Sequence, residues 1–275
     1  MYNKIKRKKR PIRFLLSRAL WHSRLCYLFT IKFASGIKIR FFPTAGSSSF
    51  WIDPYSCIDE ELFISSYLRE GDTFIDVGAN IGYITLTAAK KIGDSGKIIS
   101  IEPHPRTFIF LNKNIKANAF MNIETYNLAL GNEEGKISFS DSKSDEQNFI
   151  TKSGIIDVSV KRLDELFNGP SVEFLKIDTE GYELFVLQGA KKTLTKTKTI
   201  FLEIFQSHFD RYNYKKKDLL RFLAEQEFKI FVFQSAKVLN EIDPNSEIDL
   251  EKFENIVATK DVSFLKSRLQ GYSIN

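Results

Sequence analysis

GDTFIDVGANIG, residues Gly71–Gly82, is the stretch that decides the fold. Its first half, Thr73–Val77, is β-branched or aromatic except at one position, which predicts a central parallel strand covered on both faces. Gly78 and Gly82 bracket the turn that follows, where glycine permits positive φ and lets backbone N–H groups approach a ligand. A helix predicted over residues 83–92 directs its N-terminal amides at this turn, an arrangement that suits a carboxylate or a phosphate.

Two acidic residues narrow the class of ligand. The glycine spacing differs from that of a dinucleotide-binding turn, and Asp76 closes the strand where a pyrophosphate would be repelled and an ammonium group attracted. A second strand, Ile98–Ile101, ends in Glu102, and an acid at this position can accept hydrogen bonds from both hydroxyls of a ribose. A ligand with an ammonium group and a ribose is an adenosylated amino acid. The pair therefore indicates S-adenosylmethionine.

From Gly71 onward, predicted strands and helices alternate, which is typical of an α/β fold with a doubly wound, mostly parallel sheet. The polar link Ser140–Gly154 is a candidate mobile lid over the cofactor site. Further strands are predicted at 123–128, 135–139, 155–160, 172–177, 199–204, 229–233 and 255–259, the last one antiparallel at the sheet edge. Helices are predicted at 105–118, 218–226 and 262–269, with another helix beginning at 164–167.

The N-terminal part differs in charge from the rest. Residues 1–52 contain twelve Lys and Arg and no acid, whereas the other 223 residues contain 28 basic and 34 acidic side chains. Arg18, His22 and Arg24 interrupt the apolar run, which excludes a signal peptide and a transmembrane helix. Three interpretations stay open: a solvated basic tail with a helix packed on the domain, peripheral contact of residues 4–35 with an anionic membrane, and a nucleic-acid-binding arm.

We expect three parts: a basic leader over 1–35, a hairpin and helix over 36–70 packed on the core, and a main domain over 71–275. The hairpin is predicted from Ile37–Phe42 and Ser49–Ile52, and the helix from Asp59–Leu68. The two cysteines of the chain form no metal or redox motif, so we expect reduced thiols and a cytoplasmic protein, with contact at the inner face of the membrane left open. The sequence does not fix the oligomeric state.

A second informative stretch, LKIDTEGYEL, covers Leu175–Leu184. Acids at the carboxyl ends of parallel strands gather at the crevice where open α/β sheets bind ligands. Asp178 and Glu180 are therefore expected on the same rim as Asp76 and Glu102. A structural alternative is that Asp178 or Glu180 caps the helix that follows.

Three side chains are candidates for a catalytic base: Asp178, Glu180 and His208. The pKa of histidine suits proton transfer near neutral pH, and His208 lies just beyond the strand predicted at 199–204, although a structural role is the alternative. Asp178, Glu203 and His208 could also gather a divalent cation, since carboxylate oxygens are hard ligands. Because this spacing is not diagnostic, we assign no metal ligand.

Four blocks of sequence together resemble the FkbM-type S-adenosylmethionine-dependent methyltransferases. They are DVGANIGYITL (Asp76–Leu86), SIEPHP (Ser100–Pro105), NLALG (Asn127–Gly131) and LKIDTEGYELFVLQGA (Leu175–Ala190), and they follow the family's order across roughly residues 60–205. The resemblance implies a seven-stranded Rossmann-like methyltransferase sheet whose last strand is antiparallel. It also implies O-methylation of hydroxyls on sugars, glycolipids or polyketide-type products.

The same resemblance implies roles for single residues. The methionine end of the cofactor is assigned to Asp76, Gly78, Asn80 and Gly82, the ribose to Glu102, the adenine border to Asn127, Ala129 and Leu130, and the neighbourhood of the methyl group to Asp178 and Glu180 with Glu183 behind them. The expected acceptor is a sugar hydroxyl of a surface glycan or glycolipid. Two alternatives are kept: an RNA methyltransferase with the leader as its arm, and a non-catalytic cofactor-binding adaptor on membranes.

Overall fold

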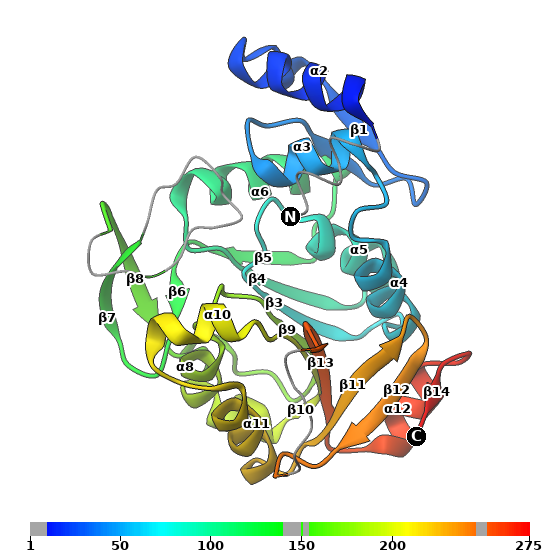
Figure 1. Ribbon diagram of the computed structural model, residues 1–275, viewed down its shortest axis with the longest axis vertical. Helices are drawn as coiled ribbons and strands as arrows, with labels where there is room; N and C mark the ends of the chain where they lie inside the picture. Colours follow the sequence, from blue (N-terminus) through cyan, green and yellow to red (C-terminus); the bar gives the residue numbers. More distant parts are fainter. Residues whose placement is uncertain (1–9, 140–149, 151–153, 246–251) are drawn as a thin grey trace.

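The computed structural model describes residues 10–139, 150, 154–245 and 252–275 (Figure 1). Within these ranges nine strands form one sheet in the order β14-β12-β11-β13-β10-β9-β3-β4-β5. They are β3 (Thr73–Val77), β4 (Lys97–Ile101), β5 (Ile123–Tyr126), β9 (Val172–Ile177), β10 (Thr197–Glu203), β11 (Lys229–Ser235), β12 (Val238–Ile242), β13 (Asn255–Thr259) and β14 (Ser273–Ile274). The run from β10 to β5 is parallel throughout. The predicted α/β fold with a mostly parallel sheet is confirmed.

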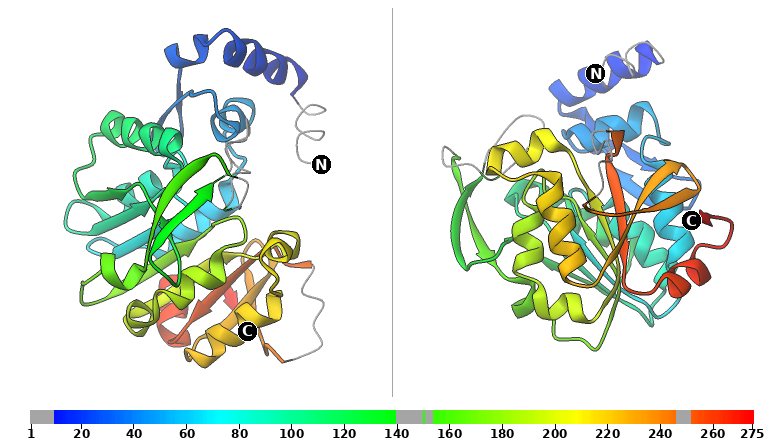
Figure 2. Two further views of the ribbon diagram at one scale, coloured as in Figure 1. Left: turned by 90° about the vertical axis from the view of Figure 1, so that its left-hand side faces the viewer. Right: turned by 60° about the horizontal axis from the view of Figure 1, so that its bottom comes forward.

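Both faces of the sheet are covered by helices (Figures 1 and 2). Side chains alternate along β3: Phe74 joins one hydrophobic cluster, while Ile75 and Val77 join the other. Helices α4 (Ile58–Tyr67), α5 (Tyr83–Ile92), α6 (Pro105–Asn118) and α12 (Val262–Arg268) contribute to the first cluster, and α7 (Leu163–Leu166), α8 (Glu183–Gln188), α9 (Lys191–Thr195) and α11 (Lys216–Glu225) to the second. Double coverage explains why the central strands are apolar at nearly every position.

The last part of the sheet differs from the prediction. Strand β13 is antiparallel, as predicted, but it lies between β10 and β11 and not at the edge. The edge is formed by β12 and β14, which the sequence pattern did not reveal because one is interrupted by Asn240 and Glu241 and the other is two residues long. The seven strands expected of the family are present, and these two extend them.

The hairpin predicted from Ile37–Phe42 and Ser49–Ile52 is wrong in its second strand. A hairpin is formed by β1 (Thr30–Lys32) and β2 (Lys38–Arg40), whereas Ser49–Ile52 belongs to helix α3 (Ala45–Ile52). The side chain of Thr44 accepts a hydrogen bond from the N–H of Ser47 at 3.0 Å and caps this helix. An N-cap threonine before small residues is a helix signal that outweighs the strand propensity of the residues after it.

Helix α2 (Pro11–His22) packs on α3 at one end of the molecule, followed by the 3₁₀ turn η1 (Leu25–Leu28) (Figure 1). The hairpin is tied to α6 by the side chain of Asn114, which accepts a hydrogen bond from the N–H of Arg40 at 2.9 Å and donates one to the carbonyl of Ile81 at 2.8 Å. Asn114 is fully buried. Asn114 therefore links the N-terminal part to the loop that follows β3.

Three short strands form a separate small sheet in the order β6-β8-β7: β6 (Ala129–Leu130), β7 (Gly135–Phe139) and β8 (Ile156–Lys161). The strands predicted at 135–139 and 155–160 are thus confirmed. The candidate lid Ser140–Gly154 lies almost wholly outside the described residues. None of the helices in the described ranges has the length and apolar run that a bilayer crossing requires.

The C-terminal helix closes the fold against the start of the first core strand. The guanidinium of Arg268 makes a two-pronged ion pair with Asp72, with N–O distances of 2.7 and 3.0 Å. Arg69 donates a hydrogen bond to the carbonyl of Arg268 at 2.6 Å. Such bidentate pairs are stronger than single contacts.

Candidate active site

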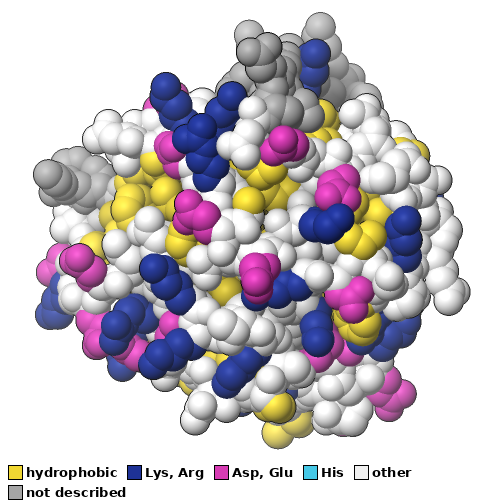
Figure 3. All heavy atoms as spheres, turned by 90° about the horizontal axis from the view of Figure 1, so that it is seen from below, with side chains coloured by type: hydrophobic (Ala, Val, Ile, Leu, Met, Phe, Trp, Pro, Cys, Tyr) yellow, Lys and Arg dark blue, Asp and Glu magenta, His cyan; other side chains and the backbone are white. Residues whose placement is uncertain are grey.

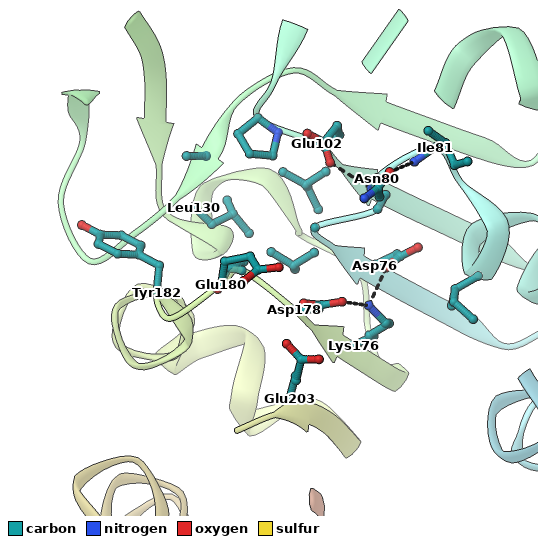
Figure 4. A pocket seen from close by; sticks show the side chains of 18 of the residues that line it. Asp76, Asn80, Ile81, Glu102, Leu130, Lys176, Asp178, Glu180, Tyr182 and Glu203 are labelled. Carbon is teal, nitrogen blue, oxygen red and sulfur yellow. Dashed lines mark hydrogen bonds and ion pairs between the residues drawn. The ribbon is translucent and has the colours of Figure 1, made fainter. Parts of the chain in front are cut away.

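A cavity of about 500 Å³ opens at the carboxyl ends of β3, β4, β9 and β10 (Figure 4). Helices α3 and α4 add Gly46, Phe50 and Glu60 to its wall. Parallel sheets bind their ligands at this edge. Of the catalytic and cofactor-binding residues predicted from the sequence, those that line the cavity are Asp76, Gly78, Asn80, Glu102, Ala129, Leu130, Asp178, Glu180 and His208.

The turn after β3 is packed directly against the end of β9. Gly78 has φ +82°, and a Cβ built on it would lie 1.8 Å from the carbonyl oxygen of Asp178. The N–H of Asp178 in turn donates to the carbonyl of Val77 at 3.0 Å. Asn80 also has positive φ, +49°. Only glycine fits at position 78, because a side chain there meets backbone rather than a flexible neighbour.

Glu102 is buried and is held by backbone N–H groups of two loops. Its Oε2 accepts from the N–H of Asn80 at 2.9 Å, and its Oε1 accepts from the N–H of His104 at 2.8 Å. The carboxylate therefore links the turn after β3 with the end of β4 (Figure 4). A carboxylate can accept about four hydrogen bonds, so contacts with two ribose hydroxyls are compatible with this anchoring.

Two predicted residues support the site without lining the cavity. Gly82 is the N-cap residue of α5 with φ +91°, and a Cβ there would lie 2.5 Å from Leu111. The side-chain amide of Asn127 donates to the carbonyls of Glu102 and Pro103, each at 2.9 Å. Asn127 therefore positions the strand end that carries Glu102.

Lys176 forms the charged centre of the cavity floor. Its ammonium lies 3.1 Å from Asp178, 3.6 Å from Glu60 and 4.0 Å from Asp76. Burial disfavours its charged form, but the three carboxylates outweigh this effect and raise its pKa. A buried ammonium with three acidic neighbours stays protonated and fixes their orientation.

Asp76 is fully buried beside Lys176. Its Oδ2 accepts a hydrogen bond from the hydroxyl of Thr85 at 2.6 Å. Burial raises the pKa of Asp76, and Lys176 and Thr85 partly offset this shift. Asp76 thus lines the cavity while Thr85 and Lys176 hold its carboxylate in place. Direct contact of Asp76 with an ammonium group stays a prediction.

Three carboxylates converge at the ends of β9 and β10. Oxygens of Asp178, Glu180 and Glu203 lie within 4.8 Å of one another (Figure 4). Burial raises the pKa of Glu203 well above its usual range, and the neighbouring acids Asp178 and Glu180 raise it further. The trio differs from the one considered in the sequence, because Glu180 takes the place of His208. Oxygen donors of this kind suit a hard divalent cation, but acids also gather at strand ends without one.

His208 and Glu180 form a pair at the cavity rim. The Nδ1 of His208 lies 3.2 Å from Oε2 of Glu180. Burial and then the guanidinium of Arg211 lower the pKa of His208 below its usual 6.5, so the imidazole is neutral at pH 7. Neighbouring Gly181 has φ +112°, and a Cβ there would lie 2.5 Å from the carbonyl oxygen of His208. The glycine thus permits the close approach that forms the pair.

Glu183 holds the turn between β9 and α8 in place. Its Oε1 accepts hydrogen bonds from the N–H of Thr179 at 2.8 Å, from the Thr179 hydroxyl at 3.0 Å and from the N–H of Gly181 at 3.2 Å. The side chain is 1% exposed. The acidic block at 178–183 therefore contains two kinds of residue: Asp178 and Glu180 line the cavity, and Glu183 orients the turn that carries them.

A family model described as the methyltransferase FkbM domain matches residues 76–230, more than half of the chain. The chain belongs to the FkbM methyltransferase family. The resemblance found in the four sequence blocks is confirmed, and the matched segment supplies the glycine turn, Glu102, the acidic block and His208.

Three curated relatives of the chain carry methyltransferase names. Methyltransferase 1 of Beauveria bassiana is 29% identical over 146 residues, covering 43% of this chain and 58% of the relative. Hexuronic acid methyltransferase AglP of Haloferax volcanii is 29% identical over 141 residues, covering 50% and 57%. 2-O-methyltransferase NoeI of Sinorhizobium fredii is 25% identical over 174 residues, covering 54% and 70%. The chain spans less than two thirds of the length of the first two.

Several residues of the FkbM site were not foreseen. Glu60 reaches Lys176 from α4, and Phe50 and Tyr182 line the cavity. Glu60 lies far from the strand ends in the sequence and follows no spacing rule, so no local pattern could reveal it. Tyr182 lies inside the block 175–184. Its aromatic side chain next to Glu180 and Gly181 could have indicated that it lines the cavity.

Proposed function

We propose that the protein is an S-adenosylmethionine-dependent O-methyltransferase that acts on a sugar hydroxyl of a surface glycan or glycolipid. The observation that carries the proposal is that Glu102 and the His208–Glu180 pair line one cavity. The name of one relative, a hexuronic acid methyltransferase, supports a sugar acceptor, and the name of another, a 2-O-methyltransferase, supports transfer to oxygen. As part of the proposal we place the enzyme in the cytoplasm.

The residues present fit the cofactor. Glu102 would take the ribose, the buried apolar side chains of Ala129 and Leu130 would border the adenine, and the backbone of the turn at 78–82 would hold the methionine end. When bound, S-adenosylmethionine supplies a methyl group on a sulfonium leaving group. The chain's own task is to hold an acceptor hydroxyl in line, which contributes ~7–11 kcal/mol in well-oriented systems, and to take its proton.

His208 is the base we propose. The carboxylate of Glu180 at Nδ1 fixes the ring so that Nε2 is the nitrogen that accepts the hydroxyl proton, and the lowered pKa keeps the ring neutral at pH 7. As the proton moves to Nε2, Glu180 stabilises the imidazolium that forms. Asp178, paired with Lys176, lies beside this route and orients the acceptor.

Replacing His208 by Gln is expected to lower kcat by about 10²-fold, the typical share of a positioned base. Affinity for S-adenosylmethionine should stay as in the wild type, because His208 contributes to the acceptor side. The wild-type rate should fall as pH drops through the His208 pKa, below 6.5, since the imidazolium cannot accept a proton. In the variant the rate should no longer fall at low pH. The control is His22→Gln, because His22 is exposed. An unchanged pH–rate profile in the variant would remove His208 from the mechanism.

We expect EDTA to leave turnover unchanged. Lys176 already supplies a positive charge beside Asp178, which offsets part of the negative charge of the carboxylate trio. Turnover is measured after chelation and again after adding Mg²⁺ or Mn²⁺. Loss of activity with EDTA and recovery with either ion would assign Asp178, Glu180 and Glu203 as metal ligands instead.

The test of the function is incubation of the purified protein with labelled S-adenosylmethionine and fractionated glycans, glycolipids and RNA. We expect label in a carbohydrate fraction, released as an O-methyl sugar on hydrolysis. Label in RNA alone, or tight cofactor binding without transfer to any fraction, would contradict the proposal.

A further inference from the structure

Helix α2 has two apolar faces, and within the described part of the chain only one of them is covered. Ser17 is fully buried against the rest of the molecule, and Phe14 and Trp21 on the same face are partly buried. On the other face Ile12, Leu15 and Leu16 are 72%, 64% and 50% exposed. Their spacing of i, i+3 and i+4 aligns them in one stripe along the helix.

The exposed apolar surface continues beyond the helix. Leu25, Tyr27, Leu28 and Phe29 are 50%, 44%, 78% and 39% exposed. Seven of the twelve large apolar side chains that are strongly exposed in the described part of the chain thus fall within residues 12–29. Scattered exposed apolar residues are normal, but a concentration in one short segment marks an interaction surface.

Basic side chains flank this stripe. At about 100° per residue, Arg13 falls on one side of Ile12, Leu15 and Leu16, and Arg18 on the other. Both arginines lie in the stretch of residues 1–52 that contains no acid. The opposite end of the molecule, seen in Figure 3, shows Lys and Arg intermingled with Asp and Glu. The charge asymmetry of the N-terminal part is therefore absent from the face seen in Figure 3.

We propose that α2 and η1 form a docking surface for an anionic membrane. The apolar stripe would enter the boundary between headgroups and acyl chains, and the flanking arginines would contact anionic headgroups. A second copy of the chain is a poorer occupant, because pairing two such stripes brings like-charged arginines together. Nucleic acid is also a poorer occupant, since it leaves the apolar stripe uncovered.

The docking surface is connected to the active site through α3. This helix packs against α2, and its Gly46 and Phe50 line the cavity. Docking would therefore bring the cavity close to the lipid surface. On the proposed function, this favours an acceptor that is itself attached to lipid, such as a glycolipid.

The test is co-sedimentation of the full chain with vesicles. We expect binding to vesicles of equal parts phosphatidylcholine and phosphatidylglycerol, and little binding to phosphatidylcholine alone. Two double variants test the surface, Leu15→Asp/Leu16→Asp and Arg13→Glu/Arg18→Glu. The affinity of each for the phosphatidylglycerol vesicles should fall by a factor on the order of ten or greater. Their matched controls are Met121→Asp, at a position 91% exposed elsewhere, and Lys191→Glu/Lys192→Glu on the exposed part of α9.

Several outcomes would overturn the proposal. One is equal binding of both double variants and the wild type. Another is a wild-type dimer in solution that Leu15→Asp/Leu16→Asp dissociates, and a third is salt-sensitive RNA binding with no vesicle binding. Cofactor affinity measured on the same variants separates this test from the proposed function, because it should be unchanged even where vesicle binding is lost.

Discussion

Glu102→Ala is expected to abolish useful affinity for S-adenosylmethionine. The variant removes the carboxylate that would accept both ribose hydroxyls and that also anchors the N–H groups of Asn80 and His104. Two hydrogen bonds to a charged acceptor contribute roughly 3–6 kcal/mol, which corresponds to about 10²–10⁴-fold in affinity. Isothermal titration calorimetry with S-adenosylmethionine and S-adenosylhomocysteine measures the loss directly.

The matched control is Glu124→Ala on neighbouring β5. Glu124 is about half exposed and pairs with Lys97, so its removal should leave cofactor affinity intact. Because Glu102 also stabilises two loops, the melting curve of Glu102→Ala must be recorded with and without ligand. A folded Glu102→Ala protein that binds the cofactor as tightly as the wild type would show that the nucleoside lies elsewhere.

Gly78→Ala is expected to cause a large loss of stability. The new Cβ would lie 1.8 Å from the carbonyl oxygen of Asp178, and the positive φ of +82° disfavours any side chain. Because the obstacle is backbone, the turn and the end of β9 must move apart, at a cost of roughly 3–5 kcal/mol. We expect a melting temperature lower by roughly 10 °C and no measurable cofactor binding.

Gly271→Ala separates the two causes. Gly271 has φ +89°, close to that of Gly78, but among the described residues no atom beyond its two chain neighbours lies within 4 Å of the position a Cβ would take. In this control only the positive φ lowers the free energy of unfolding, by about 1–2 kcal/mol. Equal melting temperatures for the two variants would mean that the close approach of Gly78 to Asp178 is not what constrains the turn.

The sequence was most informative where local chemistry and fold agree. The glycine turn at 78–82, the acids closing β3, β4 and β9, and the alternation of strands and helices each follow from short-range rules, so the sheet and the rim of the cavity could be predicted. Asp76 and Glu102 line one cavity, as predicted, because they lie at strand ends that parallel topology brings together. The ligand inferred from this pair stays a prediction.

What could not be predicted depends on contacts between distant segments. Glu60 meets Lys176 only because α4 packs across the sheet, and Thr44 caps α3 through a single hydroxyl in a stretch that reads as a turn. The prediction that β13 lies at the sheet edge is wrong because its position also depends on contacts between distant segments. Its apolar pattern predicts a strand but does not distinguish an edge from an interior place, which pairing with β10 and β11 decides.

The interior position of β13 has a consequence for biosynthesis. While the ribosome is still extending the polypeptide, β10 and β11 have already emerged, but the strand that joins them is made only after β12. Until then β10 and β11 each have an unpaired strand edge, and such edges are prone to pair with other chains. The ion pair between Arg268 and Asp72 forms later still, because Arg268 follows β13 in the chain. A stop codon shortly before residue 255 should thus yield an aggregating product and not a smaller working enzyme.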